Sequence, residues 1–302
     1  MLTHLKTPIL LANIEDKNKI IESIYYDDLQ RKKKEIKLNQ CPHCFRQFGR
    51  RDTLTVHLRT CRTKMEQMLK MYEDNPSHFR HLKIDKHGEQ KLKLAFPLPN
   101  EERLVMIISG ANGCGKSTFI RLLLLDYFSA YKNRDFYLFS TQEYDTLDVF
   151  PNLIKISLDE SFLKEPLTLD ALRNSICIFD DVDSIRDKKI QKAVDGLKHD
   201  ILKNGRFHTP DGKRDISQDI DVIITNHMVL GGHETKAMIH ESFYYVLFPQ
   251  GTTAHSIDTI CKKYAGLDKE QTQKVIKNES RAVIIHKNYP KYVLTDKEIF
   301  LV

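Results

Sequence analysis

The side chains best suited to chemistry lie between Leu104 and Leu125, a stretch that reads LVMIISGANGCGKSTFIRLLLL. Within it, Gly110, Gly115, Lys116 and Ser117 match the pattern G-x-x-x-x-G-K-[ST]. Glycines let the backbone fold around a phosphate, and N–H groups at the start of the next helix point at the anion. The lysine reaches the β- and γ-phosphates, and the serine hydroxyl ligates Mg²⁺. We therefore predict an ATP site built by Gly110, Ala111, Asn112, Gly113, Cys114, Gly115, Lys116, Ser117 and Thr118.

A pair of carboxylates, Asp180 and Asp181, follows the apolar run of residues 175–179. That run predicts a buried strand, and ligands of open α/β sheets bind at the carboxyl ends of the strands. We expect Asp180 to hold Mg²⁺ together with Ser117, and Asp181 to polarise the attacking water. The alternative is that both carboxylates cap the helix that follows.

A third predicted strand, residues 222–225, ends in Thr225, Asn226 and His227. A polar side chain at such a strand end can sense the γ-phosphate and position the water. We favour Asn226 as this sensor, with Thr225 as the second candidate and His227 as a turn residue.

Phosphoryl transfer also needs a cation for the charge that develops on the phosphoryl group. The candidates are Arg186, Arg206 and Arg214. Arg206 follows Gly205, which has the position of a helix C′ residue, so its guanidinium could reach a neighbouring subunit. An ordinary surface arginine near the helix end is the alternative.

Alternating strands and helices must position these groups. Strands are predicted at residues 91–98, 103–109, 135–140, 153–157, 175–179, 222–225, 243–248, 282–286 and 292–294, and helices at 116–130, 187–204 and 255–264. The alternation predicts an α/β fold of the P-loop NTPase type, with a mostly parallel sheet covered by helices on both faces.

A second motif, CPHCFRQFGRRDTLTVHLRTC at residues 41–61, places Cys41, Cys44, His57 and Cys61 at the spacing of a tetrahedral Zn²⁺ site. Phe48 and Leu54 would form the small core that the metal holds together. This motif resembles a C2H2-type zinc finger in its Cys2HisCys variant. Whether such a finger contacts DNA or protein stays open.

Charge is distributed unevenly along the 302 residues, whose net charge is +6. Residues 31–93 hold 17 Lys and Arg against 7 Asp and Glu, so the remainder is net negative. A basic segment beside a near-neutral body favours a polyanionic partner, of which DNA is the obvious one, and a solvated basic linker is the alternative. The six cysteines form no disulfide framework, which favours a reducing compartment. Neither a signal peptide nor an apolar run of about 18 residues is evident.

These features divide the chain into four parts. Residues 1–40 are predicted to be a basic helical arm, with a helix over residues 15–34, and residues 41–62 to be the zinc finger. Residues 63–90 are predicted to be a basic helical linker, and residues 91–302 to be the P-loop ATPase domain.

With these motifs in order, the chain resembles the genome-packaging ATPases of nucleocytoplasmic large DNA viruses, a family of the FtsK–HerA class of DNA-pumping P-loop ATPases. The matching stretches lie in residues 103–302 and read ISGANGCGKST, SICIFDDVD, LKNGRFH, DVIITNH and YYVLFPQG, followed by YAGLDKE and RAVIIHKNYPKYVLTDKEIFLV. The resemblance implies that Lys116 and Ser117 are Walker A residues, Asp180 and Asp181 the Walker B pair, and Asn226 the sensor. It also implies that Arg206 acts as a finger across a ring. Residues 209–219 form either a DNA-facing loop through Lys213 and Arg214 or a surface insertion.

The resemblance implies an ATP hydrolase that uses Mg²⁺ to drive double-stranded DNA through a homo-oligomeric ring into a capsid. It further implies contact with capsid or portal-vertex proteins and location in the host cytoplasm, with the virion as a further site. Two alternatives are open: another DNA-pumping ATPase of the FtsK–HerA class, and a zinc-finger DNA-binding nucleotide switch without motor activity.

Overall fold

The computed structural model describes residues 10–16, 19–25, 81–83, 91–98, 102–142, 146–227 and 233–302. All four predicted zinc ligands, Cys41, Cys44, His57 and Cys61, lie outside these residues, as does most of the predicted arm and linker. No helix within the described ranges is long and apolar enough to cross a bilayer.

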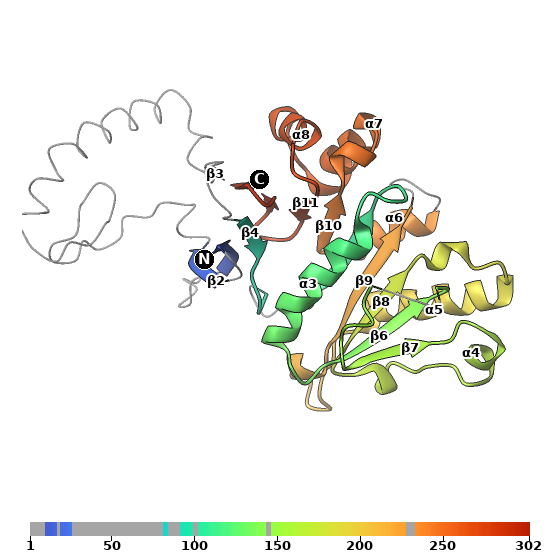
Figure 1. Ribbon diagram of the computed structural model, residues 1–302. Coiled ribbons are helices and arrows are strands. Elements are labelled where there is room, and N and C mark those ends of the chain that lie inside the picture. The colour runs from blue at the N-terminus through green and yellow to red at the C-terminus, as the bar shows by residue number, and fades with distance from the viewer. Residues whose placement is uncertain are drawn as a thin grey trace, which may run out of the picture.

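A ten-stranded sheet forms the centre of the molecule, in the order β3-β13-β12-β11-β10-β5-β9-β8-β6-β7 (Figure 1). From β10 to β7 every neighbouring pair is parallel, whereas the strands from β11 to β3 are antiparallel. The parallel strands are β5 (Val105–Ser109), β6 (Asp135–Ser140), β7 (Leu153–Ile156), β8 (Ser175–Asp180), β9 (Ile220–Asn226) and β10 (Tyr244–Leu247). The antiparallel strands are β3 (His81–Lys83), β11 (Val283–His286), β12 (Tyr292–Leu294) and β13 (Glu298–Leu301).

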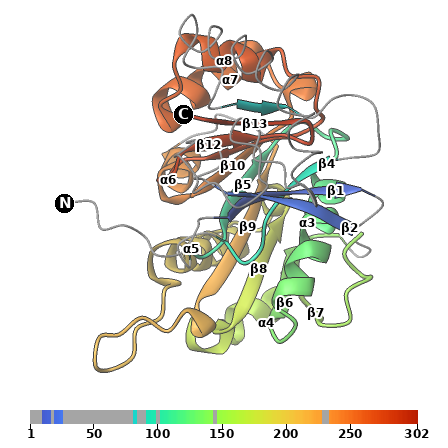
Figure 2. The same ribbon diagram turned by 90° about the vertical axis from the view of Figure 1, so that its left-hand side faces the viewer.

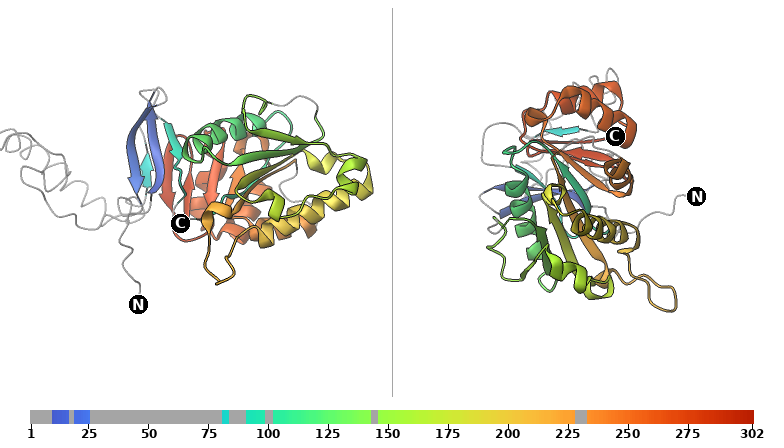
Figure 3. Two further views of the ribbon diagram at one scale, coloured as in Figure 1. Left: turned by 90° about the horizontal axis from the view of Figure 1, so that it is seen from below. Right: turned by 90° about the vertical axis from the view of Figure 1, so that its right-hand side faces the viewer.

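Helices cover both faces of this sheet, as predicted. Figure 3 shows α3 on one face, with α5 and α6 on the other. The described helices are α3 (Lys116–Ala130), α4 (Glu160–Lys164), α5 (Lys188–Asn204), α6 (His233–Glu241), α7 (Ala254–Thr259) and α8 (Lys269–Ile276). The predicted helix over residues 255–264 is α7 continued by a π-helical turn, Ile260–Ala265.

The alternation of side chains along β5 divides the apolar interior in two. Met106 and Ile108 belong to the core under α3, whereas Val105 and Ile107 belong to the core under α5 and α6. Successive side chains of a strand point to opposite faces, so a strand covered on both faces must be apolar throughout. This requirement explains why the predicted strand before the phosphate loop is an uninterrupted apolar run.

A small antiparallel sheet, β2-β1-β4, packs beside the large one (Figure 2). It consists of β1 (Leu10–Asp16), β2 (Lys19–Tyr25) and β4 (Lys91–Leu94). Lys93 of β4 connects this sheet to α3 through ion pairs. Its Nζ lies 2.7 Å from a carboxylate oxygen of Glu15 in β1 and 3.3 Å from a carboxylate oxygen of Asp126 in α3.

The helix predicted over residues 15–34 is therefore wrong where the structure describes it. The apolar residues 20, 21 and 24 are isoleucines, whose β-branched side chains suit strands, and β1 supplies the pairing partner. Likewise, part of the predicted helical linker, His81–Lys83, is strand β3, paired with β13. Strand β3 depends on a partner distant in the sequence, and β1, the partner of β2, is itself paired with the distant β4. Local periodicity does not reveal these pairings.

Candidate nucleotide-binding and catalytic site

The sheet order brings the predicted catalytic segments to one edge. Strand β9 lies between β5 and β8, with Ser109 opposite Asn226 and Ile224 opposite Phe179. The carboxyl ends of these three parallel strands are therefore neighbours, and the segments that follow them converge.

The phosphate loop has the predicted form. Gly113 and Gly115 have φ angles of +74° and +108°, a region that side chains with a Cβ rarely adopt, and α3 begins directly at Lys116. Lys116 is buried, and its Nζ donates to the carbonyl oxygen of Gly110 at 3.0 Å. The ammonium group is thus held over the loop that would enclose a phosphate.

His227 joins Lys116 to Asp181. The Lys116 Nζ lies 3.3 Å from His227 Nδ1, and His227 Nε2 lies 2.9 Å from an Asp181 carboxylate oxygen. An ammonium group can only donate, so Nδ1 is the acceptor, and Nε2 is the ring nitrogen nearest Asp181. His227 therefore lies in close polar contact with both the predicted phosphate-binding lysine and the predicted water-activating carboxylate.

Thr225 holds the acidic pair in place. Its hydroxyl donates to Asp180 Oδ1 at 2.8 Å and accepts from the Asp181 backbone N–H at 3.0 Å. Asp181 has a φ of +52°, which turns its carboxylate out of the strand direction and toward the pocket. Gln142, two residues after β6, also donates to Asp181, at 3.3 Å.

A pocket of about 610 Å³ opens over these groups. Its lining is Asn112, Gly113, Gly115, Lys116, Ser117, Thr118, Thr141, Gln142, Asp181, Ser184, His227 and Arg281. Seven of these positions are among the predicted site residues, whereas Gly110, Ala111, Cys114, Asp180, Asn226 and Arg206 do not line the pocket.

The preferred sensor, Asn226, lies deeper than expected. Its side chain is largely buried, and its backbone carbonyl oxygen accepts from the Gly110 N–H at 3.1 Å. The next residue, His227, is the one that reaches Lys116 and Asp181. Sequence reasoning ranked these residues in the opposite order, because the strand was expected to end one residue earlier than it does.

The other pocket residues that sequence reasoning missed are Thr141, Gln142, Ser184 and Arg281. The rule that ligands bind beyond strand carboxyl ends could have indicated Gln142, since it follows a predicted strand. Arg281 precedes a strand, so that rule gives no signal for it.

Arg206 lies at the opposite edge of the sheet. The N–H of Ile220, the first residue of β9, donates to the carbonyl oxygen of Gly205, whereas the pocket lies beyond the last residue of β9. At about 3.3 Å per residue, the length of β9 separates Arg206 from the pocket of its own chain by roughly 20 Å. Arg206 is exposed, and its Cζ lies 5.5 Å from the ring centroid of Phe243.

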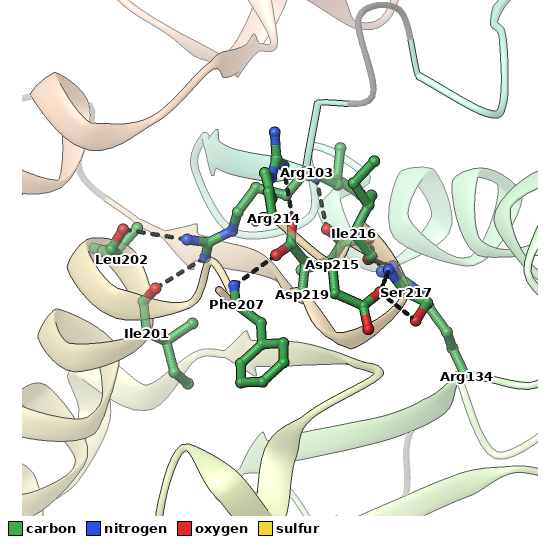
Figure 4. Close-up of polar contacts among 12 residues, drawn as sticks. Arg103, Arg134, Ile201, Leu202, Phe207, Arg214, Asp215, Ile216, Ser217 and Asp219 are labelled. Carbon is green, nitrogen blue, oxygen red and sulfur yellow. Dashed lines mark hydrogen bonds and ion pairs between the residues drawn. The ribbon is translucent and has the colours of Figure 1, made fainter. Parts of the chain in front are cut away.

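The backbone around Arg206 is held by buried charged groups (Figure 4). Arg103 donates to the carbonyl oxygens of Ile201 and Leu202 at the end of α5, at 2.9 and 3.4 Å. Burial lowers the pKa of Arg103 to about 10. Gly205 has φ −71°, not the left-handed conformation of a C′ glycine, so that prediction is wrong. Glycine is required here because a Cβ would lie 2.5 Å from Arg103 Nη2.

Asp219 anchors the loop that follows. This fully buried carboxylate accepts from the Phe207 N–H at 2.8 Å and from Arg214 Nη2 at 2.6 Å (Figure 4). Lys213 Nζ lies 3.1 Å from an Asp211 carboxylate oxygen at the tip. Both basic side chains of the loop therefore already have acidic partners within it.

Comparisons with known proteins agree with this fold. Residues 105–240 match the family described as AAA domain (dynein-related subfamily). The chain is 28% identical over 200 residues to the uncharacterized protein V3 of Sputnik virophage, which covers 65% of this chain and 77% of the relative.

Two similar solved structures are of nucleotide complexes. The genome packaging NTPase B204 from Sulfolobus turreted icosahedral virus 2, in complex with ATP-gammaS, has 14% identity and a TM-score of 0.40 over 66% of this chain and 98% of that chain. The monomer form of the pCW3 conjugation coupling protein TcpA with ATPgS has 10% identity and a TM-score of 0.41 over 72% and 65%. The family match and the site geometry together support a nucleotide-binding, AAA-type P-loop ATPase domain.

Proposed function

We propose that this protein is an ATP hydrolase that uses Mg²⁺ and drives double-stranded DNA into a viral capsid. The observation that supports hydrolysis is the pair of contacts that His227 makes with Lys116 and Asp181. All three residues line one pocket, together with residues of the phosphate loop. A site that only bound nucleotide would not need a carboxylate placed beside the histidine that contacts the phosphate-binding lysine.

The residues have separate roles in this proposal. Lys116 binds the β- and γ-phosphates, and loop N–H groups bind the rest of the phosphate chain. Asp181 accepts a proton from the attacking water, and Thr225 keeps Asp181 in position through the hydrogen bond to its backbone. His227 releases Lys116 when the lysine turns to the phosphates, and it then orients Asp181 through Nε2.

Magnesium fits the oxygen atoms present. Ser117 lines the pocket, and the buried carboxylate of Asp180 lies at the carboxyl end of strand β8. Hydroxyl and carboxylate oxygens are the ligands that Mg²⁺ prefers, usually with several retained waters. Ser117 would bind the ion directly and Asp180 through water, and the ion would neutralise charge on the phosphates.

A second subunit completes the site in this proposal. Because Arg206 lies across the sheet from its own pocket, it can serve as an arginine finger only for a neighbour. A homo-oligomeric ring provides such a neighbour at every site. The buried contacts of Arg103 and Asp219 favour this role, because they hold the backbone on both sides of Arg206.

DNA translocation and packaging rest on charge and on motif resemblance. The basic balance of residues 31–93 favours a polyanionic partner, and the motifs across residues 103–302 resemble viral genome-packaging ATPases. The virophage relative supports a viral setting. We further propose a Zn²⁺ site at Cys41, Cys44, His57 and Cys61, contact with capsid proteins, and action in the host cytoplasm.

The decisive experiment measures ATP hydrolysis by the full chain, with and without long double-stranded DNA. Wild type, Lys116→Ala and Asp181→Ala are compared, with ATP binding measured in parallel. We expect DNA to stimulate hydrolysis and both substitutions to abolish it, with Asp181→Ala still binding ATP. Hydrolysis that DNA leaves unchanged would refute the motor, and ATP binding without hydrolysis would favour the nucleotide switch.

A further inference from the structure

Arg281 is brought to the phosphate loop by strand pairing alone. Leu247 at the end of β10 is opposite Ser109 of β5 on one side and Val283 of β11 on the other. Since β11 runs antiparallel to β10, it begins at the edge where the parallel strands end. Arg281, two residues before Val283, therefore lies beside the loop that follows Ser109.

The guanidinium of Arg281 lies against the loop backbone. Its Nε donates to the carbonyl oxygen of Cys114 at 3.0 Å. A Cβ built on Gly115 would lie 2.8 Å from Nε and 2.9 Å from both Cζ and Nη2. Those three similar distances mean that the planar group lies flat over Gly115, in space that any larger residue would fill.

Among the described residues, Arg281 uses only a small part of its hydrogen-bonding capacity. A guanidinium has five N–H donors, and the Cys114 carbonyl takes one of them. Within the described part of the chain, no other hydrogen bond or ion pair of Arg281 is observed, and the residue lines the same pocket as Lys116. A guanidinium with donors available in a phosphate-loop pocket is suited to an anionic ligand.

We propose that Arg281 binds the α- and β-phosphates of the nucleotide in its own subunit. This inference rests on the proposed function of the pocket. The loop N–H groups around Gly115 are those that cradle the α- and β-phosphates, and Arg281 lies over that residue. Asp181 and His227 mark the other end, where the γ-phosphate reacts. Arg281 is thus distinct in position and role from Arg206, which serves a neighbouring subunit.

The role predicts a specific kinetic pattern. ADP, ATP and the transition state all contain the α- and β-phosphates, so Arg281 contributes to binding each of them equally. Loss of such uniform binding raises KM and leaves kcat unchanged. Hydrogen bonds to a charged group predict that Arg281→Ala raises the Kd for ADP by about ten- to one-hundredfold.

The test compares ADP binding by calorimetry and ATP hydrolysis for wild type, Arg281→Ala, Arg281→Lys and Arg121→Ala. Arg121 is the matched control, because it is exposed on α3 four residues after Ser117 and does not line the pocket. We expect Arg281→Lys to be intermediate, since lysine keeps the charge but not the planar fork. We expect Arg121→Ala to bind ADP like wild type. Circular dichroism confirms that each variant is folded.

Three outcomes would overturn the inference, and they differ in whether they also overturn the proposed function. Arg281→Ala that binds ADP like wild type overturns this inference alone. A fall in kcat with unchanged ADP affinity would place Arg281 at the γ-phosphate and also overturns it. A wild-type chain that binds neither ADP nor ATP overturns the proposed function together with this inference.

Discussion

Replacing Thr225 with valine removes one hydroxyl from the end of β9 while keeping the branched shape of the side chain. The residue is fully buried, so the change tests hydrogen bonding with little change in packing. The wild-type hydroxyl donates to Asp180 Oδ1 at 2.8 Å and accepts from the Asp181 N–H at 3.0 Å. Valine removes both interactions at once.

The size of the effect follows from these two contacts. A hydrogen bond to a charged group contributes about 1.5–3 kcal/mol, and one between neutral groups about 1 kcal/mol. We therefore expect Thr225→Val to lower the free energy of unfolding by about 2.5–4 kcal/mol. Because Asp181 is held in a left-handed conformation by the same hydroxyl, its carboxylate should shift. A misplacement of about 1 Å can reduce kcat by about a hundredfold.

Urea unfolding followed by circular dichroism measures the first effect, and steady-state ATP hydrolysis measures the second. Thr225→Ser is the matched control, because it keeps the hydroxyl and loses a methyl group, and it should retain most of kcat. If Thr225→Val unfolds within about 0.5 kcal/mol of wild type and retains full activity, the assigned role of Thr225 is refuted.

Two further changes test the surrounding structure. Burial lowers the pKa of Lys287 to about 8 in the folded protein, from about 10.5 when it is exposed. Between these two pH values the unfolded chain binds more protons than the folded one. The free energy of unfolding should therefore rise with pH across this window, by up to about 3 kcal/mol. Lys287→Met should lack this rise in urea unfolding at stepped pH, and an equal rise in both proteins would contradict the assignment. Gly205→Ala should lower the urea midpoint, because its Cβ meets Arg103, at a cost of about 1–3 kcal/mol. Gly196 lies within α5, the helix that ends just before Gly205, and a Cβ at Gly196 would meet nothing within 4 Å. Gly196→Ala should therefore stabilise the protein by about 0.5–1 kcal/mol. Equal urea midpoints for the two variants would contradict the predicted clash at Gly205.

Prediction from the sequence succeeded where the signal is local. The helix predicted at residues 116–130 and the strand predicted at 135–140 match α3 and β6. Both have strong local determinants: a glycine-rich turn before the helix, and a buried apolar pattern in the strand. The strand predicted at residues 222–225 is shorter than β9 (Ile220–Asn226), because the polar residue Asp221 interrupts the apolar run.

Asp221 illustrates why that interruption misled. Its buried carboxylate accepts from the Leu104 N–H at 2.8 Å, from Tyr127 and from Arg134 Nη1 at 2.5 Å. These partners are distant in the sequence. The buried carboxylate is stable inside the strand only because folding brings these hydrogen-bond donors to it. The strands β1, β2 and β13 were missed or read as helix for a related reason, since β1 pairs with the distant β4, β13 pairs with the distant β3, and β2 pairs with β1.

The amino-acid sequence by itself determined the nucleotide-loop chemistry of this protein, because every donor in the loop belongs to one continuous segment whose residue types encode its backbone. It also determined that the acidic pair Asp180 and Asp181 comes at the end of a buried strand. Only the tertiary structure decided that His227, not Asn226, contacts both Lys116 and Asp181, that Arg206 lies at the opposite end of β9 from its own pocket, and that Arg281 lies over Gly115. Those relations depend on strand order and register, which are set by packing between segments that the sequence separates by up to 167 residues.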